Sequence, residues 1–175
     1  MLPKTPLKVL LADPSLFTGP YDGALTRGLL EAGARPSWVT RPVREGDRPE
    51  LPPDLVDDFF YRHVDAHPAL QGRLRTLAKG LAHATGLARL VARAWSRGCD
   101  LVHFQWTVLP SLDALAIRLI RWRRPVVLTV HDTVPFNGQK LPLLQRLGYD
   151  SPIRQADRVI VHTASARDRL LERGI

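Results

Sequence analysis

The chain has 175 residues, of which 45% are hydrophobic and 24% are charged, so it suits one ordinary folded domain and excludes a collagen-like, coiled-coil or disordered chain. No stretch reaches about 18 consecutive apolar residues, and the early apolar run at residues 9–12 is too short for a signal sequence. We therefore expect neither secretion nor membrane spanning. The single cysteine, Cys99, cannot form an internal disulfide, and a cytoplasmic location is expected.

Positive charge is concentrated in the second part of the chain. Lys and Arg number 25 against 17 Asp and Glu, a formal net charge of +8. Residues 1–63 hold 8 basic against 9 acidic residues, whereas residues 64–175 hold 17 against 8. Two interpretations stay open, namely arginine-rich codon usage in a GC-rich genome and a basic face for phosphates, anionic lipids or nucleic acid.

The first part of the chain predicts a strand, a helix and a second strand. Residues 8–12 (KVLLA) form a short aliphatic run, typical of a buried strand that opens the fold. A glycine-bearing loop is expected at residues 18–23, followed by a helix whose leucines have helical spacing and which stops at Gly33. Residues 38–40 fit a second strand. Residues 59–61 (Phe-Phe-Tyr) fit either a third strand or a loop anchored by its aromatic rings.

A long basic amphipathic helix is predicted over residues 70–97, either continuous or broken at Gly80 or Gly86, and ending at Gly98. Apolar residues recur at steps of three and four, and basic residues occupy other positions. This pattern fits a solvated face over a packed apolar stripe, or a helix that adsorbs to anionic membrane lipid. The apolar residues are Leu70, Leu74, Leu77, Leu81, Leu87, Val91 and Trp95, and the basic ones are Arg73, Arg75, Lys79, Arg89, Arg93 and Arg97.

Strands and helices continue to alternate in the second half. The expected strands are residues 100–106, 125–130 and 157–162, and the expected helices are residues 110–122, 141–156 and 165–172. Strands that are apolar on both faces need helices on both sides of a parallel sheet, because parallel neighbours are joined by crossover connections. The predicted fold is therefore α/β, a single domain over residues 1–175 with a Rossmann-like parallel sheet and helices on both faces.

In such folds ligands bind outside the carboxyl ends of the strands. Four segments are therefore expected to share one face: residues 18–23, the residues after Phe104, the pair His131-Asp132, and residues 163–165. The candidate cleft-facing residues in these segments are Tyr21, Gln105, Trp106, Asp132, Thr163 and Ser165.

Histidines and glycines are the residues with the clearest chemistry. His131 follows an apolar strand and could hydrogen-bond or carry positive charge beside a phosphate or sugar hydroxyl, the alternative being a structural histidine. Gly19 and Gly23 lack the G-x-G-x-x-G spacing of a dinucleotide-binding loop, which disfavours NAD binding. They are either turn glycines or glycines that let backbone amides approach a phosphate. His103 and His162 fit core histidines bonded to the backbone. No metal site, nucleophile elbow or Cys-x-x-Cys pair is recognisable.

Three motifs occur in order along the second half: DLVHFQW at residues 100–106, VVLTVHDTVP at 126–135 and ADRVIVHTASARDRLLERGI at 156–175. Together they resemble the N-terminal domain of the GT-B glycosyltransferases of family 4. The resemblance implies a retaining transferase that moves a sugar from a nucleotide-sugar donor to an acceptor, in a cleft between two Rossmann-like domains. It also implies that His131 is the active-site histidine near the donor sugar. Gly19 and Gly23, more widely spaced than the family's adjacent glycines, would face the donor phosphates.

The expected function is that of the acceptor-side domain, with the donor-binding C-terminal domain missing from this chain and the chain catalytically incomplete alone. The acceptor is expected to be a sugar or a lipid-linked sugar in polysaccharide or glycoconjugate synthesis, at the inner face of the cell membrane. No cofactor is expected beyond the nucleotide-sugar substrate. The alternative is a non-catalytic membrane-surface or protein-interaction module. Nucleic acid is disfavoured as a partner, because no helix-turn-helix or aromatic-basic motif occurs.

Overall fold

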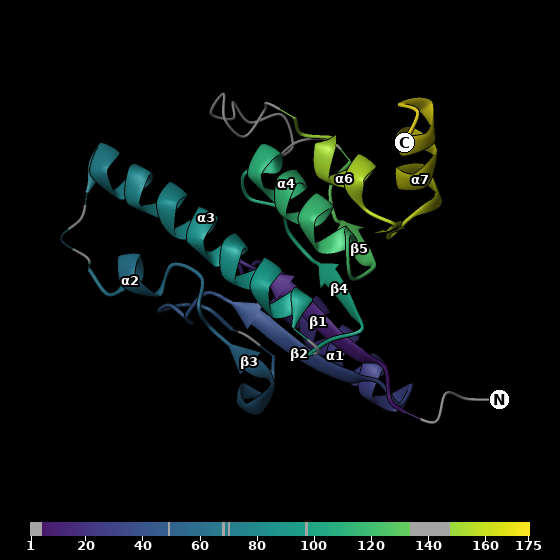
Figure 1. The fold of residues 1–175 in the computed structure, drawn as a ribbon, viewed down its shortest axis with the longest axis horizontal. Helices are drawn as coiled ribbons and strands as arrows, with labels where there is room; N and C mark the ends of the chain where they lie inside the picture. Colours follow the sequence, from purple (N-terminus) through teal and green to yellow (C-terminus); the bar gives the residue numbers. More distant parts are fainter. Residues whose placement is uncertain (1–4, 49, 68, 70, 97, 134–147) are drawn as a thin grey trace.

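The computed structural model describes residues 5–48, 50–67, 69, 71–96, 98–133 and 148–175 (Figure 1). Within these residues six parallel strands form one sheet, in the order β3-β2-β1-β4-β5-β6. The strands are β1 (Lys8–Asp13), β2 (Arg35–Thr40), β3 (Val56–Asp57), β4 (Leu101–Phe104), β5 (Val126–Val130) and β6 (Arg158–Val161). The helices are α1 (Gly19–Glu31), the 3-10 helix η1 (Pro53–Leu55), α2 (Arg62–Asp65), α3 (Gly72–Trp95), α4 (Pro110–Arg121), α6 (Ser151–Gln155) and α7 (Ala164–Glu172).

The sheet is covered on both faces, as the apolar strands predict. In β1, Leu10 and Ala12 belong to one core cluster, whereas Val9 and Leu11 belong to a second cluster. The first cluster also holds buried side chains of α3, α4, α6 and α7, and the second is completed by side chains of α1. Figure 1 shows α3 and α4 lying over the near face of the sheet. The Rossmann-like α/β fold is confirmed.

The structure corrects the reading of residues 18–23 as a loop, because α1 already begins at Gly19. Pro20 suits a first helical turn, where its missing N–H costs nothing. The helix ends at Glu31, and Gly33 follows with a φ of 77°, the left-handed conformation that glycine adopts readily. The third strand is Val56–Asp57, and residues 59–61 form a buried aromatic segment after it.

Helix α3 runs from Gly72 to Trp95 without a break at either glycine. Gly86 packs tightly against Phe60, since a Cβ at position 86 would lie 2.4 Å from the ring. The helix ends before Gly98, because Ser96 takes an extended backbone conformation. No helix in the described part of the chain is both long enough and apolar enough to span a bilayer. Leu70, Arg97 and the first residues of the helix predicted at 141–156 lie outside the described residues.

Candidate functional site

Two histidines emerge side by side where β5 and β6 end. The two strands are parallel, and their register places Val130 opposite Val161. The next residue of each strand is a histidine, so His131 and His162 become neighbours at the carboxyl edge of the sheet. His131 Nδ1 and His162 Nε2 lie 3.0 Å apart, within hydrogen-bond distance.

Two aromatic side chains pack on this histidine pair. Trp106, which follows β4, stacks on His131 with ring centroids 5.0 Å apart and an interplanar angle of 10°. Tyr21 of α1 meets both histidines edge-on, with its ring centroid 5.1 Å from His131 and 5.0 Å from His162. These four side chains, here called the aromatic-histidine cluster, join α1 to the ends of β4, β5 and β6.

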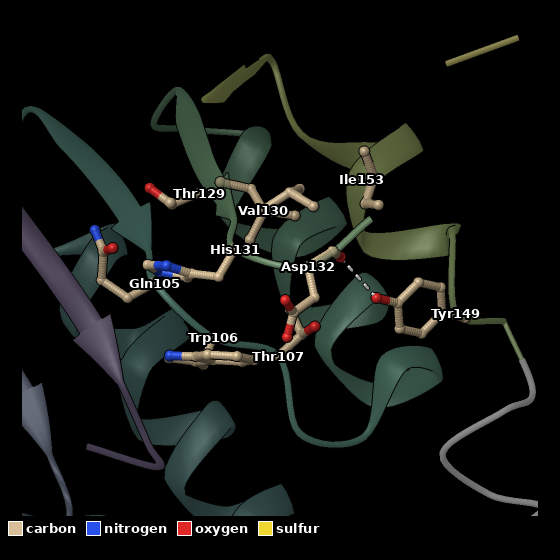
Figure 2. A pocket seen from close by; sticks show the side chains of 10 residues that line it. Gln105, Trp106, Thr107, Thr129, Val130, His131, Asp132, Tyr149 and Ile153 are labelled. Atoms are coloured by element: carbon tan, nitrogen blue, oxygen red, sulfur yellow. Dashed lines mark hydrogen bonds between the residues drawn. The ribbon is translucent and has the colours of Figure 1, made fainter. Parts of the chain in front are cut away.

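A small hollow lies beside the cluster, with a cavity volume of about 50 Å³ (Figure 2). This volume holds a few waters or the hydroxyl groups of a ligand, and is well below the roughly 300 Å³ or more of a pocket that encloses a whole small molecule. Asp132 and Tyr149 form part of its wall, and the Tyr149 hydroxyl donates a hydrogen bond of 3.0 Å to the Asp132 carbonyl oxygen. The lining residues are Gln105, Trp106, Thr107, Leu128, Thr129, Val130, His131, Asp132, Tyr149 and Ile153.

Two buried polar atoms of the lining residues have no hydrogen-bond partner in the described part of the chain: Gln105 Oε1 and His131 Nε2. The Gln105 amide nitrogen lies 3.2 Å from His103 Nε2, and the Thr129 hydroxyl oxygen lies 2.8 Å from the same nitrogen. These contacts orient the Gln105 side chain, and its Oε1 atom is left without a hydrogen-bond partner among the described residues. Because buried polar atoms are nearly always paired, this pair of atoms is suited to a polar ligand.

His131 is uncharged at neutral pH. Burial, together with the neighbouring His162, lowers its pKa to about 4, and Asp132 opposes the shift only partly. Burial likewise lowers the pKa of His103 to about 4. His131 is therefore suited to hydrogen bonding with an uncharged group such as a hydroxyl, and not to holding a phosphate as a cation.

A pair of buried carboxyl groups adjoins the cluster. Asp13 ends β1 and Asp22 lies in the first turn of α1, and both are fully buried. Burial raises the pKa of both carboxyl groups, and the charge of Asp13 raises that of Asp22 further, so the pair favours holding a proton. Neither Oδ2 atom has a hydrogen-bond partner among the described residues. The Thr18 hydroxyl donates to Asp22 Oδ1 over 3.3 Å and accepts from Trp106 Nε1 over 3.3 Å. This acid pair is thus linked through Thr18 to the aromatic-histidine cluster.

We expect Asp22→Asn to stabilise the protein at alkaline pH. Burial, together with the charge of Asp13, raises the pKa of Asp22 to about 8. A raised pKa means that the folded state holds the proton more tightly. The stabilising contribution of protonated Asp22 is therefore fully present below about pH 4 and is lost progressively as pH rises from about 4 to about 8. An asparagine amide mimics the protonated acid and cannot ionise. The variant should exceed the parent by about 1–3 kcal/mol in unfolding free energy at pH 9, with little difference at pH 4.

The measurement is urea unfolding of both proteins at a series of pH values. Asp168→Asn is the matched control, because Asp168 is exposed and its ion pair with Arg167 lies at the surface. This control should leave the pH dependence unchanged. A parent and Asp22→Asn variant with parallel pH profiles would show that Asp13 and Asp22 do not share a proton.

The structure brings together five residues selected from the sequence: Tyr21, Gln105, Trp106, His131 and Asp132. The other four selected residues, Gly19, Gly23, Thr163 and Ser165, are not part of this group. Thr163 instead caps α7 by accepting from the Ala166 N–H over 3.0 Å, and Ser165 lies exposed in that helix.

Gly19 and Gly23 lie in a helix and not in the expected loop, and close packing is seen at Gly23. Both lie in α1, Gly19 as its first residue and Gly23 one turn further. A Cβ on Gly23 would lie 2.6 Å from the Glu50 Cβ and 3.0 Å from the Glu50 carbonyl oxygen. Gly23 therefore allows the segment at Glu50 to approach the helix closely.

Of the two histidines expected to be core residues bonded to the backbone, only His103 is a core residue, and its hydrogen-bond partners among the described residues are side chains. These side chains are those of Thr129 and Gln105. His162 pairs with His131 at the site. The sequence does contain a sign of this pairing. Each of two predicted strands ends in Val-His, at residues 130–131 and 161–162, and parallel pairing of the strands brings the two histidines together. Among the described residues, no three His, Cys, Asp or Glu side chains gather closely enough to hold a metal ion.

A parallel α/β sheet with a polar hollow at its carboxyl edge defines a Rossmann-like ligand-binding domain. The family model of Glycosyltransferase Family 4 matches residues 23–175, which is most of the chain. The chain belongs to glycosyltransferase family 4 and corresponds to the N-terminal domain of a GT-B enzyme, so the resemblance of its motifs is confirmed. Its role is in sugar transfer. No curated relative matches the chain.

Proposed function

We propose that this chain binds the acceptor in a retaining transfer of a sugar from a nucleotide-sugar. The proposal is carried by two buried atoms at the carboxyl edge of a family 4 domain, Gln105 Oε1 and His131 Nε2. Neither atom has a hydrogen-bond partner among the described residues. A sugar hydroxyl both donates and accepts hydrogen bonds, so it suits a glutamine oxygen and the nitrogen of an uncharged imidazole.

In this reaction the bond between the anomeric carbon and the donor's diphosphate oxygen breaks. A new bond forms between that carbon and the acceptor's hydroxyl oxygen, and the hydroxyl proton leaves with the nucleoside diphosphate. Gln105 Oε1 and His131 Nε2 both hydrogen-bond the reacting end of the acceptor, with His131 next to the sugar that is being transferred. Trp106 holds the imidazole ring in place by stacking on it.

The acceptor proposed here is a long or lipid-linked sugar, used in polysaccharide or glycoconjugate synthesis. The hollow of about 50 Å³ has room only for the reacting end of such a molecule. The remainder would therefore extend over the surface of the domain. Compact acceptors that must be enclosed to bind fit this geometry less well.

The test compares donor and acceptor binding by the chain in isothermal titration calorimetry. UDP-glucose, UDP-N-acetylglucosamine and GDP-mannose should bind weakly or not at all, because the hollow is too small for a nucleotide. Sub-micromolar binding of any of them would overturn the acceptor-side assignment. A transfer assay with the same donors and a lipid-linked sugar, the donor-binding domain being supplied in cis or in trans, should yield a glycosylated lipid. Failure to form product with every donor would count against the transferase proposal.

A further inference from the structure

His162 lies on the outer side of the aromatic-histidine cluster. It follows β6, is exposed, and packs against Tyr21 with ring centroids 5.0 Å apart. Its ring is tilted by 42° from that of His131, with the two centroids 4.9 Å apart. Of these two histidines in the described part of the chain, only His131 lines the hollow. His162 therefore acts on a ligand in the hollow through His131.

A single hydrogen lies between the two imidazole rings. His162 Nε2 and His131 Nδ1 are 3.0 Å apart, so one of these nitrogens carries a hydrogen and the other accepts it. An uncharged imidazole holds its proton on only one of the two ring nitrogens. The direction of this hydrogen bond therefore decides whether His131 Nε2, the nitrogen at the hollow, is a donor or an acceptor.

The charge distribution within the pair favours His162 as the donor. The pKa of His131 is lowered by burial and by the charge of His162, so a proton added to the pair resides on His162. His162 is exposed, and solvent stabilises that charge. A charged imidazole carries hydrogens on both nitrogens and can only donate. In that state His131 Nδ1 must accept.

The hollow favours the same direction. Gln105 and His131 both line it, and Gln105 Oε1 and His131 Nε2 have no hydrogen-bond partner among the described residues (Figure 2). The glutamine oxygen can only accept. If His131 Nε2 carries a hydrogen, the two atoms form one acceptor and one donor, which a single hydroxyl group matches. If both atoms accept, one hydroxyl group cannot satisfy them, because it has only one hydrogen.

We propose that His162 is a positioning residue, which donates its Nε2–H to His131 Nδ1 and thereby keeps the His131 proton on Nε2, as a donor at the hollow. A charged His162 and a neutral His162 protonated at Nε2 both donate in this way. The ligand atom that meets His131 must then be an oxygen with a lone pair. The inference rests on the proposed function for identifying this oxygen as that of a sugar hydroxyl, whereas the tautomer is a property of the chain itself.

This tautomer excludes His131 as the base in the proposed transfer. With a hydrogen on Nε2, and with Nδ1 accepting from His162, the ring has no free lone pair to take the hydroxyl proton of the acceptor. That proton therefore leaves with the nucleoside diphosphate, as in the proposed reaction. His131 instead donates a hydrogen bond to an oxygen at the reacting end of the acceptor.

The test reads the tautomer directly, by nitrogen-15 NMR of the chain labelled at its histidines and kept at neutral pH. A ring nitrogen that carries a hydrogen and one that does not have well-separated resonances. The His131 signals are those that disappear in His131→Phe. The parent should show His131 protonated at Nε2 and not at Nδ1. Protonation at Nδ1 would overturn the proposal, whatever the transfer assay shows.

Two variants of closely similar shape separate hydrogen-bond donation from packing. His162→Gln keeps a group that donates, whereas His162→Glu presents a carboxylate that only accepts. The first should leave the His131 proton on Nε2, and the second should move it to Nδ1. With the donor-binding domain supplied, transfer should fall at least about 10-fold in His162→Glu and be largely recovered in His162→Gln. Circular dichroism checks that both variants are folded.

The outcomes distinguish this inference from the proposed function. A His162→Glu variant that keeps the His131 proton on Nε2, or that moves it to Nδ1 without loss of transfer, would overturn the inference. A parent with the expected tautomer but no transfer from any donor would instead count against the proposed function. His67→Gln, at an exposed histidine beyond α2, is the matched control and should change neither the His131 signals nor transfer.

Discussion

Replacing His131 with alanine is expected to lower sugar transfer about 100-fold, the usual scale for loss of a positioned hydrogen-bonding group at the reaction centre. The substitution removes Nε2, the buried nitrogen that no described residue satisfies. The rate should be read in the transfer assay described above, at saturating donor and acceptor. Transfer at the parental rate would exclude His131 from the site.

The alanine variant also loses packing, so its interpretation needs a second substitution. The His131 ring stacks on Trp106, meets Tyr21 edge-on and hydrogen-bonds with His162. Losing these contacts should lower the unfolding free energy by about 1–2 kcal/mol. His131→Phe keeps an aromatic ring on Trp106 but has no nitrogen. It should be close to the parent in stability while losing transfer to the same extent.

The control for both variants is His67→Ala. His67 is exposed, and its Nδ1 atom lies 2.7 Å from the carbonyl oxygen of His63 in the same turn of chain. This change should alter neither transfer nor stability measurably. The pKa of about 4 adds a further expectation, namely that ionisation of His131 leaves the transfer rate constant between pH 6 and 8. An inflection near pH 6.5 that disappears in His131→Phe would show that this histidine titrates normally.

The sheet and its functional edge could be predicted from the sequence because parallel strands impose a strong pattern. Residues 126–130 are apolar on both faces, which only an interior strand tolerates, and polar character returns at His131. Parallel pairing then sends every such transition to the same edge. Gln105, Trp106 and Asp132 were found by this reasoning, and the structure places all three at the hollow.

Contacts between elements could not be predicted in the same way. The spacing of Leu77 and Leu81 shows that both lie on one face of a helix, but spacing does not say which face the sheet covers. That choice depends on neighbours such as Phe60, which packs against Gly86 and so determines the side of α3 that is buried. The acid pair of Asp13 and Asp22 likewise arises from two elements that meet only in the folded chain.

The buried network centred on Asp113 is such a contact, and it supports the segment that leads from the hollow into α4. Asp113 Oδ2 accepts from the N–H groups of Val108 and Leu109, over 2.7 Å each. Its Oδ1 atom accepts from His83 Nε2 over 2.8 Å. The Tyr61 hydroxyl completes the network by donating over 2.7 Å to His83 Nδ1. Burial raises the pKa of Tyr61, aided by the charge of Asp113, so the phenol keeps its proton.

Asp113→Ala is therefore expected to lower the unfolding free energy by about 3–5 kcal/mol, because it leaves one buried and two partly buried donors without an acceptor. His83→Ala should cost less, since the two backbone N–H groups keep their carboxylate. Because His83 acts through Asp113, the double variant should lose less than the sum of the single losses. Asp168→Ala, an exposed surface change, should stay within about 0.5 kcal/mol of the parent. In urea unfolding, additive losses of unfolding free energy would show that His83 and Asp113 stabilise the domain separately. A loss below about 1 kcal/mol for Asp113→Ala would mean that water takes the place of the carboxylate.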